Sequence, residues 1–247
     1  MDESGYGIGT SATTRVLAVG GTGGRRAEKG ITGRQEWVRT IECVAADGQA
    51  LPRLVIFKGK NLSTSYLPTV HPEVTTDWHW CTSDIGWSND TLALEWLKNI
   101  FLPFTETSSS TNIATTVPST STSPPISQDR RLLIVNGHGS HVQSTFIALC
   151  IENAIDLVIL PSHSSHKTQP LNVAVFTPMK LAMADDADKW ASSTPDRISK
   201  GEWTNSFVQA SIKAMTPSNI RAGWRGSGLW PFRASLSRDQ LTSIGTI

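Results

Sequence analysis

With 247 residues and a net charge of +1, the chain is long enough for one large α/β domain or two small ones. This charge predicts no strong general attraction to nucleic acid. No stretch approaches the roughly 20 apolar residues of a membrane-spanning helix, and no signal peptide is found. Three widely spaced cysteines without a disulfide framework indicate a reducing compartment, so we expect a soluble intracellular protein.

The first element is a polar, glycine-rich stretch at residues 1–7, and no hydrophobic strand precedes it. Taken alone, Asp2 in this stretch is interpreted as a frayed terminal residue. Residues 15–19 predict a short strand, and a glycine-rich loop follows at 20–26. That loop lacks the Gly-Lys-Ser/Thr of a phosphate-binding loop, which favours a mobile hairpin connection.

Two further strands are predicted at residues 36–46 and 51–57, joined by the turn signal Asp47-Gly48. With residues 15–19 they predict an antiparallel meander. Trp78, Trp80 and Trp87 come next. Because basic residues are not interleaved with these tryptophans, packing in the core or under a lid is favoured over base stacking.

Apolar residues at helical spacing predict a helix over 89–104, capped by Ser88 or Asn89. Residues 105–128 are different, because they are nearly all Ser, Thr and Pro and offer almost nothing to bury. Such a composition predicts disorder. We interpret the segment as an insertion within one domain that spans residues 1–247, since the strands on either side of it belong to one sheet.

The centre of the sequence is a β-α-β unit, with buried strands predicted at 132–136 and 155–160 and a helix between them. Chemistry in parallel sheets lies at the carboxyl ends of the strands. Here those ends carry two polar stretches, Asn-Gly-His-Gly-Ser-His at 136–141 and Pro-Ser-His-Ser-Ser-His at 161–166. Further helices are predicted from Asn172 to about Trp190 and over 202–215, the second ending at Thr216-Pro217.

These motifs, together with Gln-Pro-Leu-Asn-Val at 169–173, resemble the catalytic domain of the DDE superfamily of endonucleases and transposases. The resemblance is to its pogo, Tigger, jerky and centromere protein B branch. It covers essentially all of the chain outside the Ser/Thr/Pro segment. It implies a ribonuclease H-like α/β fold, in which an antiparallel meander and a parallel β-α-β unit form one mixed sheet flanked by helices. The family's first hydrophobic strand, which ends in a catalytic Asp, is expected to be missing here.

The resemblance places the family's three catalytic carboxylates at Asp2, Asn136 and Asn172. Family members use three carboxylates to hold two Mg²⁺ ions, and Mg²⁺ binds mainly to anionic oxygen. Because Asn136 and Asn172 lack the charge, we expect neither ion to bind, with at most a weak metal contact at Asp2. Other acids are poorly placed: Asp156 begins its strand, Asp185, Asp186 and Asp188 lie at least thirteen residues beyond Asn172, and Glu3 points away from Asp2 in an extended chain.

Four histidines surround these positions, and the resemblance makes them, with one glutamine, residues that line the site: His138, His141, His163, His166 and Gln169. Their spacing also suits a zinc site, but the resemblance implies none. A serine hydrolase with Ser140 as nucleophile is excluded because Gly-x-Ser-x-Gly is absent.

Two hypotheses follow from the sequence. In the first, the chain is a transposon-derived, catalytically inactive DDE endonuclease domain that binds nucleic acid. In the second, it is a retained module that binds DNA or a protein partner without catalysis. The resemblance implies a nuclear location, and the low net charge predicts weak, non-specific binding to DNA.

Overall fold

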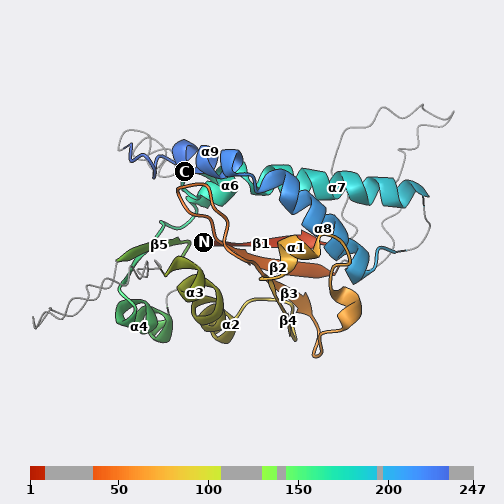
Figure 1. The fold of residues 1–247 in the computed structure, drawn as a ribbon, viewed down its shortest axis with the longest axis horizontal. Coiled ribbons are helices and arrows are strands. Elements are labelled where there is room, and N and C mark those ends of the chain that lie inside the picture. Colours follow the sequence, from red (N-terminus) through yellow and green to blue (C-terminus); the bar gives the residue numbers. More distant parts are fainter. Residues whose placement is uncertain (9–35, 107–129, 138–142, 194–196, 234–247) are drawn as a thin grey trace, which may run out of the picture.

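The computed structural model describes residues 1–8, 36–106, 130–137, 143–193 and 197–233. In this part of the chain, two β-sheets are packed between helices, as Figure 1 shows. The mixed α/β class is confirmed, and an antiparallel-plus-parallel sheet flanked by helices is consistent with a ribonuclease H-like fold. The predicted strand at 15–19, the loop at 20–26 and nearly all of the 105–128 insertion lie outside the described residues.

The larger sheet has four strands in the order β1-β2-β3-β4. β1 (Asp2–Gly7) pairs antiparallel with β2 (Trp37–Glu42), which pairs antiparallel with β3 (Leu54–Lys58). β4 (His79–Ser83), which was not predicted, pairs parallel with β3 at the far edge. Trp80 therefore lies in β4 and Trp78 directly precedes it. Both side chains pack against other aromatic rings.

Asp2 itself lies in a strand, whereas the expected loss of the hydrophobic residues before it stays a prediction. Residues Asp2–Gly7 themselves form β1, and six consecutive cross-strand pairs join them to β2. Asp2 is only 2% exposed, so it is not a frayed terminal residue. The pairing overrides the weak strand propensity of a Gly- and Asp-containing segment, because strand formation depends on neighbours more than on local preference.

The second sheet is the predicted parallel pair, β5 (Arg131–Val135) and β6 (Ile155–Ile159), connected through α4 (Ser144–Glu152). The prediction of one continuous sheet is corrected here, since no strand ladder joins β5 to β1 among the described residues. The amino group of Met1 donates one hydrogen bond of 2.8 Å to Ile134 O across the gap. β5 is also less buried than predicted, because Leu132 is 60% exposed.

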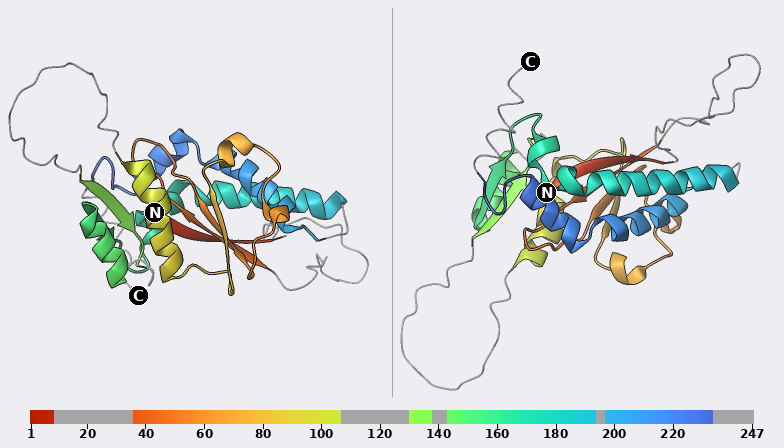
Figure 2. Two further views of the ribbon diagram at one scale, coloured as in Figure 1. Left: turned by 60° about the horizontal axis from the view of Figure 1, so that its bottom comes forward. Right: turned by 90° about the horizontal axis from the view of Figure 1, so that it is seen from above.

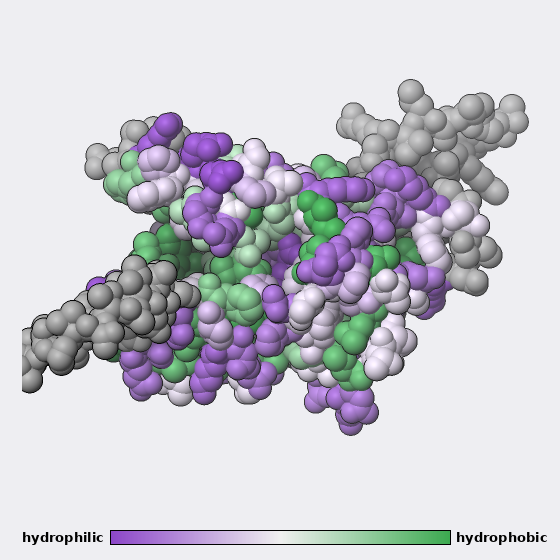
Figure 3. Space-filling model, in the orientation of Figure 1, coloured by the Kyte–Doolittle hydropathy of each residue, from purple (hydrophilic) through white to green (hydrophobic). Residues whose placement is uncertain are grey.

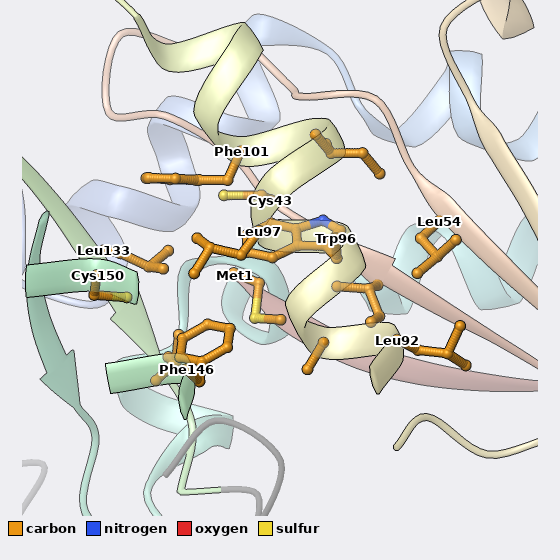
Figure 4. Close-up of a cluster of buried hydrophobic side chains, with 14 of the residues drawn as sticks. Met1, Cys43, Leu54, Leu92, Trp96, Leu97, Phe101, Leu133, Phe146 and Cys150 are labelled. Carbon is orange, nitrogen blue, oxygen red and sulfur yellow. The ribbon is translucent and has the colours of Figure 1, made fainter. Parts of the chain in front are cut away.

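Helices cover both faces of the four-stranded sheet (Figure 2). On one face lies the predicted 89–104 helix, observed as α2 (Asp90–Trp96), a π-helical turn η2 (Leu97–Phe101) and α3 (Leu102–Thr105), with the Asn89 side chain capping its start. This face packs against α4, and Figure 4 shows Met1 in the middle of the resulting cluster, near Leu97 and Phe146.

The other face is covered by α6 (Pro170–Ala174), α7 (Phe176–Ser193) and α8 (Lys200–Ala214). Aromatic rings dominate this cluster, with Trp203 and Phe207 stacked at 5.1 Å between centroids. α9 (Pro217–Gly226), which was not predicted as a helix, packs against α6. Three short helical turns complete the described elements: η1 (Thr64–Tyr66), α1 (Pro72–Thr75) and α5 (Ser165–Thr168).

Candidate functional site

The three positions that the resemblance assigns to catalytic carboxylates meet at one point of the fold. Asp2 is the first residue of β1, Asn136 directly follows β5, and Asn172 lies in the first turn of α6. The Asn136 side-chain amide donates a 2.7 Å hydrogen bond to Oδ1 of Asp2, and the Asn172 amide donates to Oδ2. The structure therefore brings together three side chains that are separated by 134 and 170 residues in sequence.

The direction of these two hydrogen bonds follows from the chemistry of the groups. An ionised carboxylate only accepts, so each amide must turn its NH₂ group, not its carbonyl oxygen, toward Asp2. The backbone N–H of Glu3 donates a third bond of 2.8 Å to Asp2 Oδ1. Both carboxylate oxygens are thus engaged by N–H donors.

Nearby charges balance in the same region. Asp2 lies opposite Glu42 in the β1–β2 register, and Glu42 is fully buried and paired with Arg53 at 3.1 Å. Lys180 on α7 interacts electrostatically with both Asp2 and Glu42. Two carboxylates and two cationic side chains therefore offset one another.

Burial sets the protonation behaviour of this group. It raises the pKa of Asp2, although the Glu3 N–H, the nearby amino terminus and Asn172 oppose the rise. Burial also lowers the pKa of Lys180, and the charges of Asp2 and Glu42 act against that shift. Sequence reasoning missed Glu42 and Lys180. The available signal for Glu42 was an acid at the end of β2 between the apolar residues Ile41 and Cys43.

Gln169 is 2% exposed and donates from Nε2 to Met1 O at 2.9 Å, so it holds the start of β1 against α6. His163 and His166 are exposed around α5, and His163 has a left-handed backbone with φ of 59°. The predicted site residues His138 and His141 lie outside the described residues. Gln169 therefore supports the site through the backbone of Met1.

The donor set present does not fit a pair of magnesium ions. Mg²⁺ requires oxygen ligands and is held mainly by carboxylates, whereas the two amides here present N–H groups to one carboxylate. Within the described ranges, no cluster of three or more His, Cys, Asp or Glu side chains could hold a metal ion.

Other acids are engaged elsewhere. Glu3 accepts from Ser88 Oγ, Asp156 pairs with Arg130, and Asp185 pairs with Lys189 on the exposed side of α7. No replacement for the two missing carboxylates is found among these three residues.

Comparison with known proteins identifies the family of the chain. The family profile of the DDE superfamily endonucleases matches residues 34–224, which is more than half of the chain. The chain belongs to the DDE superfamily of endonucleases, a family of transposase-derived nucleases. Members of this superfamily are generally metal-dependent.

One similar protein is the MFS-type transporter clz9 of Cochliobolus lunatus, which is 32% identical over 243 residues. The matched region is 98% of this chain and 24% of that protein, so the chain spans about a quarter of the relative's length. No solved structure matches the chain. Among the residues that the structure describes, no helix combines the length and the apolar character needed to cross a membrane.

Proposed function

We propose that this chain is a transposon-derived DDE endonuclease domain that binds nucleic acid but no longer cleaves it. The observation that carries the proposal is the pair of amide-to-carboxylate hydrogen bonds from Asn136 and Asn172 to Asp2. Phosphodiester cleavage by two metal ions needs anionic ligands that position both ions. Asn136 and Asn172 present N–H donors where two carboxylates would be needed. These donors stabilise the Asp2 carboxylate and provide no anionic ligands for the ions.

The test is nicking of supercoiled plasmid in the presence of Mg²⁺ or Mn²⁺. We expect the unmodified chain to nick no faster than the Asp2→Asn variant, which lacks the last carboxylate of the site. The variant serves as the control for contaminating nucleases, because a contaminant is unaffected by the substitution. Metal-dependent nicking that is present in the parent chain and lost in Asp2→Asn would contradict the proposal.

We also propose that DNA binding by the isolated chain is weak and non-specific. Its net charge is +1, so few phosphates can be neutralised. We expect a Kd of roughly 10⁻⁴ to 10⁻⁶ M for a 30-base-pair duplex, weakening steeply between 50 and 200 mM salt. Fluorescence anisotropy with two unrelated duplexes measures both the affinity and the selectivity.

A second candidate function is a retained binding module that uses the old fold without catalysis. The closed contacts of Asn136 and Asn172 with Asp2 favour it, because they keep the fold intact without metal. Tight, sequence-selective DNA binding at physiological salt would support this alternative and contradict weak, non-specific binding. A nuclear location is proposed for either function, and a fluorescent fusion excluded from the nucleus would argue against it.

A further inference from the structure

Two half-exposed tryptophans lie on one side of the four-stranded sheet. Trp37 begins β2 and is 49% exposed, and Trp87, in the segment after β4, is 48% exposed. Farther along β2 and β3, helices α2 and η2 cover this side of the sheet, where Ile41 and Leu54 are buried. Alternate side chains of a strand lie on the same side of a sheet, as Trp37 and Ile41 do. The start of β2 therefore extends this side beyond its helical cover.

Each of the two indole rings has one face held against the protein. An added Cβ at Gly5 of β1 would lie 3.5 Å from the Trp37 ring, so this ring lies across the bare backbone of the neighbouring strand. The guanidinium carbon of Arg39 lies 3.0 Å from the centre of the Trp87 ring, in a cation–π contact. Because about half of each side chain is exposed, the other face of each ring is open to solvent.

Arg39 joins the two rings into one surface. It lies two residues after Trp37 on the same side of β2, and its Nη1 would lie 3.7 Å from the same added Cβ at Gly5. Because Arg39 also contacts Trp87, the guanidinium and the two indoles are contiguous, and we call these three side chains the indole platform. Trp87 is separated from the other two residues by β3 and β4, so the pairing of basic and aromatic residues is not visible in the sequence.

The segment that carries Trp87 is fixed on both sides of this residue. Ser83 Oγ donates a 2.8 Å hydrogen bond to Trp87 O, and Ser88 Oγ donates to a carboxylate oxygen of Glu3 on β1. A ring that is already held in position loses little conformational entropy when a flat ligand stacks on it. The indole platform is therefore preorganised for such a ligand.

Exposed lysines lie beside the indole platform. The pairing of Arg39 with Ile56 places Lys58, the last residue of β3, opposite Trp37. Lys58 is exposed, and no ion pair is found for it among the described residues. Lys60 follows in the turn after β3, and Figure 3 shows this turn, located with Figure 1, as a hydrophilic projection at the lower edge of the molecule.

Acidic side chains offset part of this positive charge. Glu3 interacts electrostatically with Arg39, and Glu36 pairs with Lys200 at 2.7 Å. Asp84 is exposed in the segment before Trp87 and opposes the two lysines. The local excess of positive charge is therefore small, so contacts with phosphate alone give little affinity. A ligand of this surface must gain the rest of its affinity from the rings.

We propose that the indole platform binds single-stranded nucleic acid, with unpaired bases stacked on Trp37 and Trp87 and backbone phosphates near Lys58. Aromatic platforms of this kind accept any base, because every base has a flat π face. In a duplex both faces of each internal base are covered by its neighbours, so the platform selects single strands. The inference rests on the proposed binding of nucleic acid and places it on the opposite side of β1 from the Asp2 side chain.

The lysines favour nucleic acid over a protein partner. Trp and Arg are common in protein interfaces, but Lys is depleted there. Open indole faces next to Lys58 and Lys60 combine the two features by which single strands are bound, a stacking surface and a cationic border.

The experiment measures binding by fluorescence anisotropy with three probes: a single strand of about 15 bases, the same strand annealed to its complement, and an abasic strand of equal length. The full chain is compared with Trp37→Ala and Trp87→Ala. Trp230→Ala is the matched control, because Trp230 is 60% exposed and lies outside the indole platform. Thermal unfolding shows that each variant is folded, and the abasic probe tests stacking in the unmodified chain.

The unmodified chain should bind the single strand about tenfold more tightly than the duplex or the abasic strand. Trp37→Ala and Trp87→Ala should each weaken single-strand binding by about fivefold or more, whereas Trp230→Ala should leave it unchanged. Equal affinity for the single strand and the abasic strand would overturn the inference, as would unchanged affinity in both platform variants. In either case, binding of the duplex would leave the proposed function in place, whereas binding of none of the probes would overturn both.

Discussion

Replacing both Asn136 and Asn172 with Asp should destabilise the domain by about 1 to 3 kcal/mol at pH 7 in the absence of divalent metal, because Asp2 is buried and loses its two amide donors while the new carboxylates are half-buried. The two amide donors to Asp2 would become like charges beside it. Lys180 and Arg53, which already offset Asp2 and Glu42, supply no further positive charge. Chemical denaturation of the parent and the double variant measures the difference.

The pH dependence gives this prediction a second readout. Burial raises the pKa of Asp2 even in the parent, and clustered carboxylates raise one another's pKa further. The folded state then holds protons that the unfolded state has already released, so stability falls as pH rises above the unfolded carboxyl pKa. We expect the double variant to approach parental stability near pH 4 and to lose it toward pH 7.

Added Mg²⁺ should recover part of the loss, since three carboxylates form the kind of ligand set that the ion prefers. Asn61→Asp, at an exposed position, is the matched control and should change stability by less than about 0.5 kcal/mol. A double variant as stable as the parent at pH 7 without metal would show that Asp2 does not depend on its amide donors.

Gly223→Ala should destabilise the domain by about 2 kcal/mol. Overpacking should cost roughly 3 kcal/mol, and the better helix propensity of Ala should offset roughly 1 kcal/mol of that cost. A Cβ at Gly223 would lie 2.4 Å from Pro170 O and 3.1 Å from Pro170 C. Both are backbone atoms, so α9 would have to move away from α6, the helix that carries Asn172. Urea denaturation measures the loss.

Gly5→Ala is the control for this substitution, because the nearest atom to its added Cβ lies at an ordinary 3.5 Å from the Trp37 ring. It should cost much less than Gly223→Ala. A Gly223→Ala variant that gains stability, as helix propensity alone would predict, would mean that the close approach of α6 and α9 is not rigid.

Much of the fold could be predicted from alternation and length. The strands at 36–46, 51–57, 132–136 and 155–160 appear within a few residues of their predicted bounds. β1 could not be predicted, because its stability comes from the ladder with β2 and its own residues favour turns. α9 was not predicted because its glycines disfavour a helix. One of them, Gly223, is required for contact with α6.

For the candidate site, the motifs predicted the three positions but not how they interact. The loss of charge at Asn136 and Asn172 is visible in the sequence, yet the orientation of their amides depends on three elements meeting in space. Glu42 and Lys180 belong to no motif, so their role in balancing Asp2 required the cross-strand register and the packing of α7.

The distance in sequence between Asp2 and its partners bears on synthesis of the protein. Asp2 is synthesised before both of its partners, and Asn172 is added 170 residues after it. Translation adds about 5 to 20 residues per second. Roughly 10 to 30 s therefore pass between the synthesis of Asp2 and that of Asn172, the last donor to its carboxylate. Nascent chains that stop short of α6 should therefore be cleaved readily by protease in β1. Chains that extend past α9 should resist, since translation has by then delivered every element that holds Asp2.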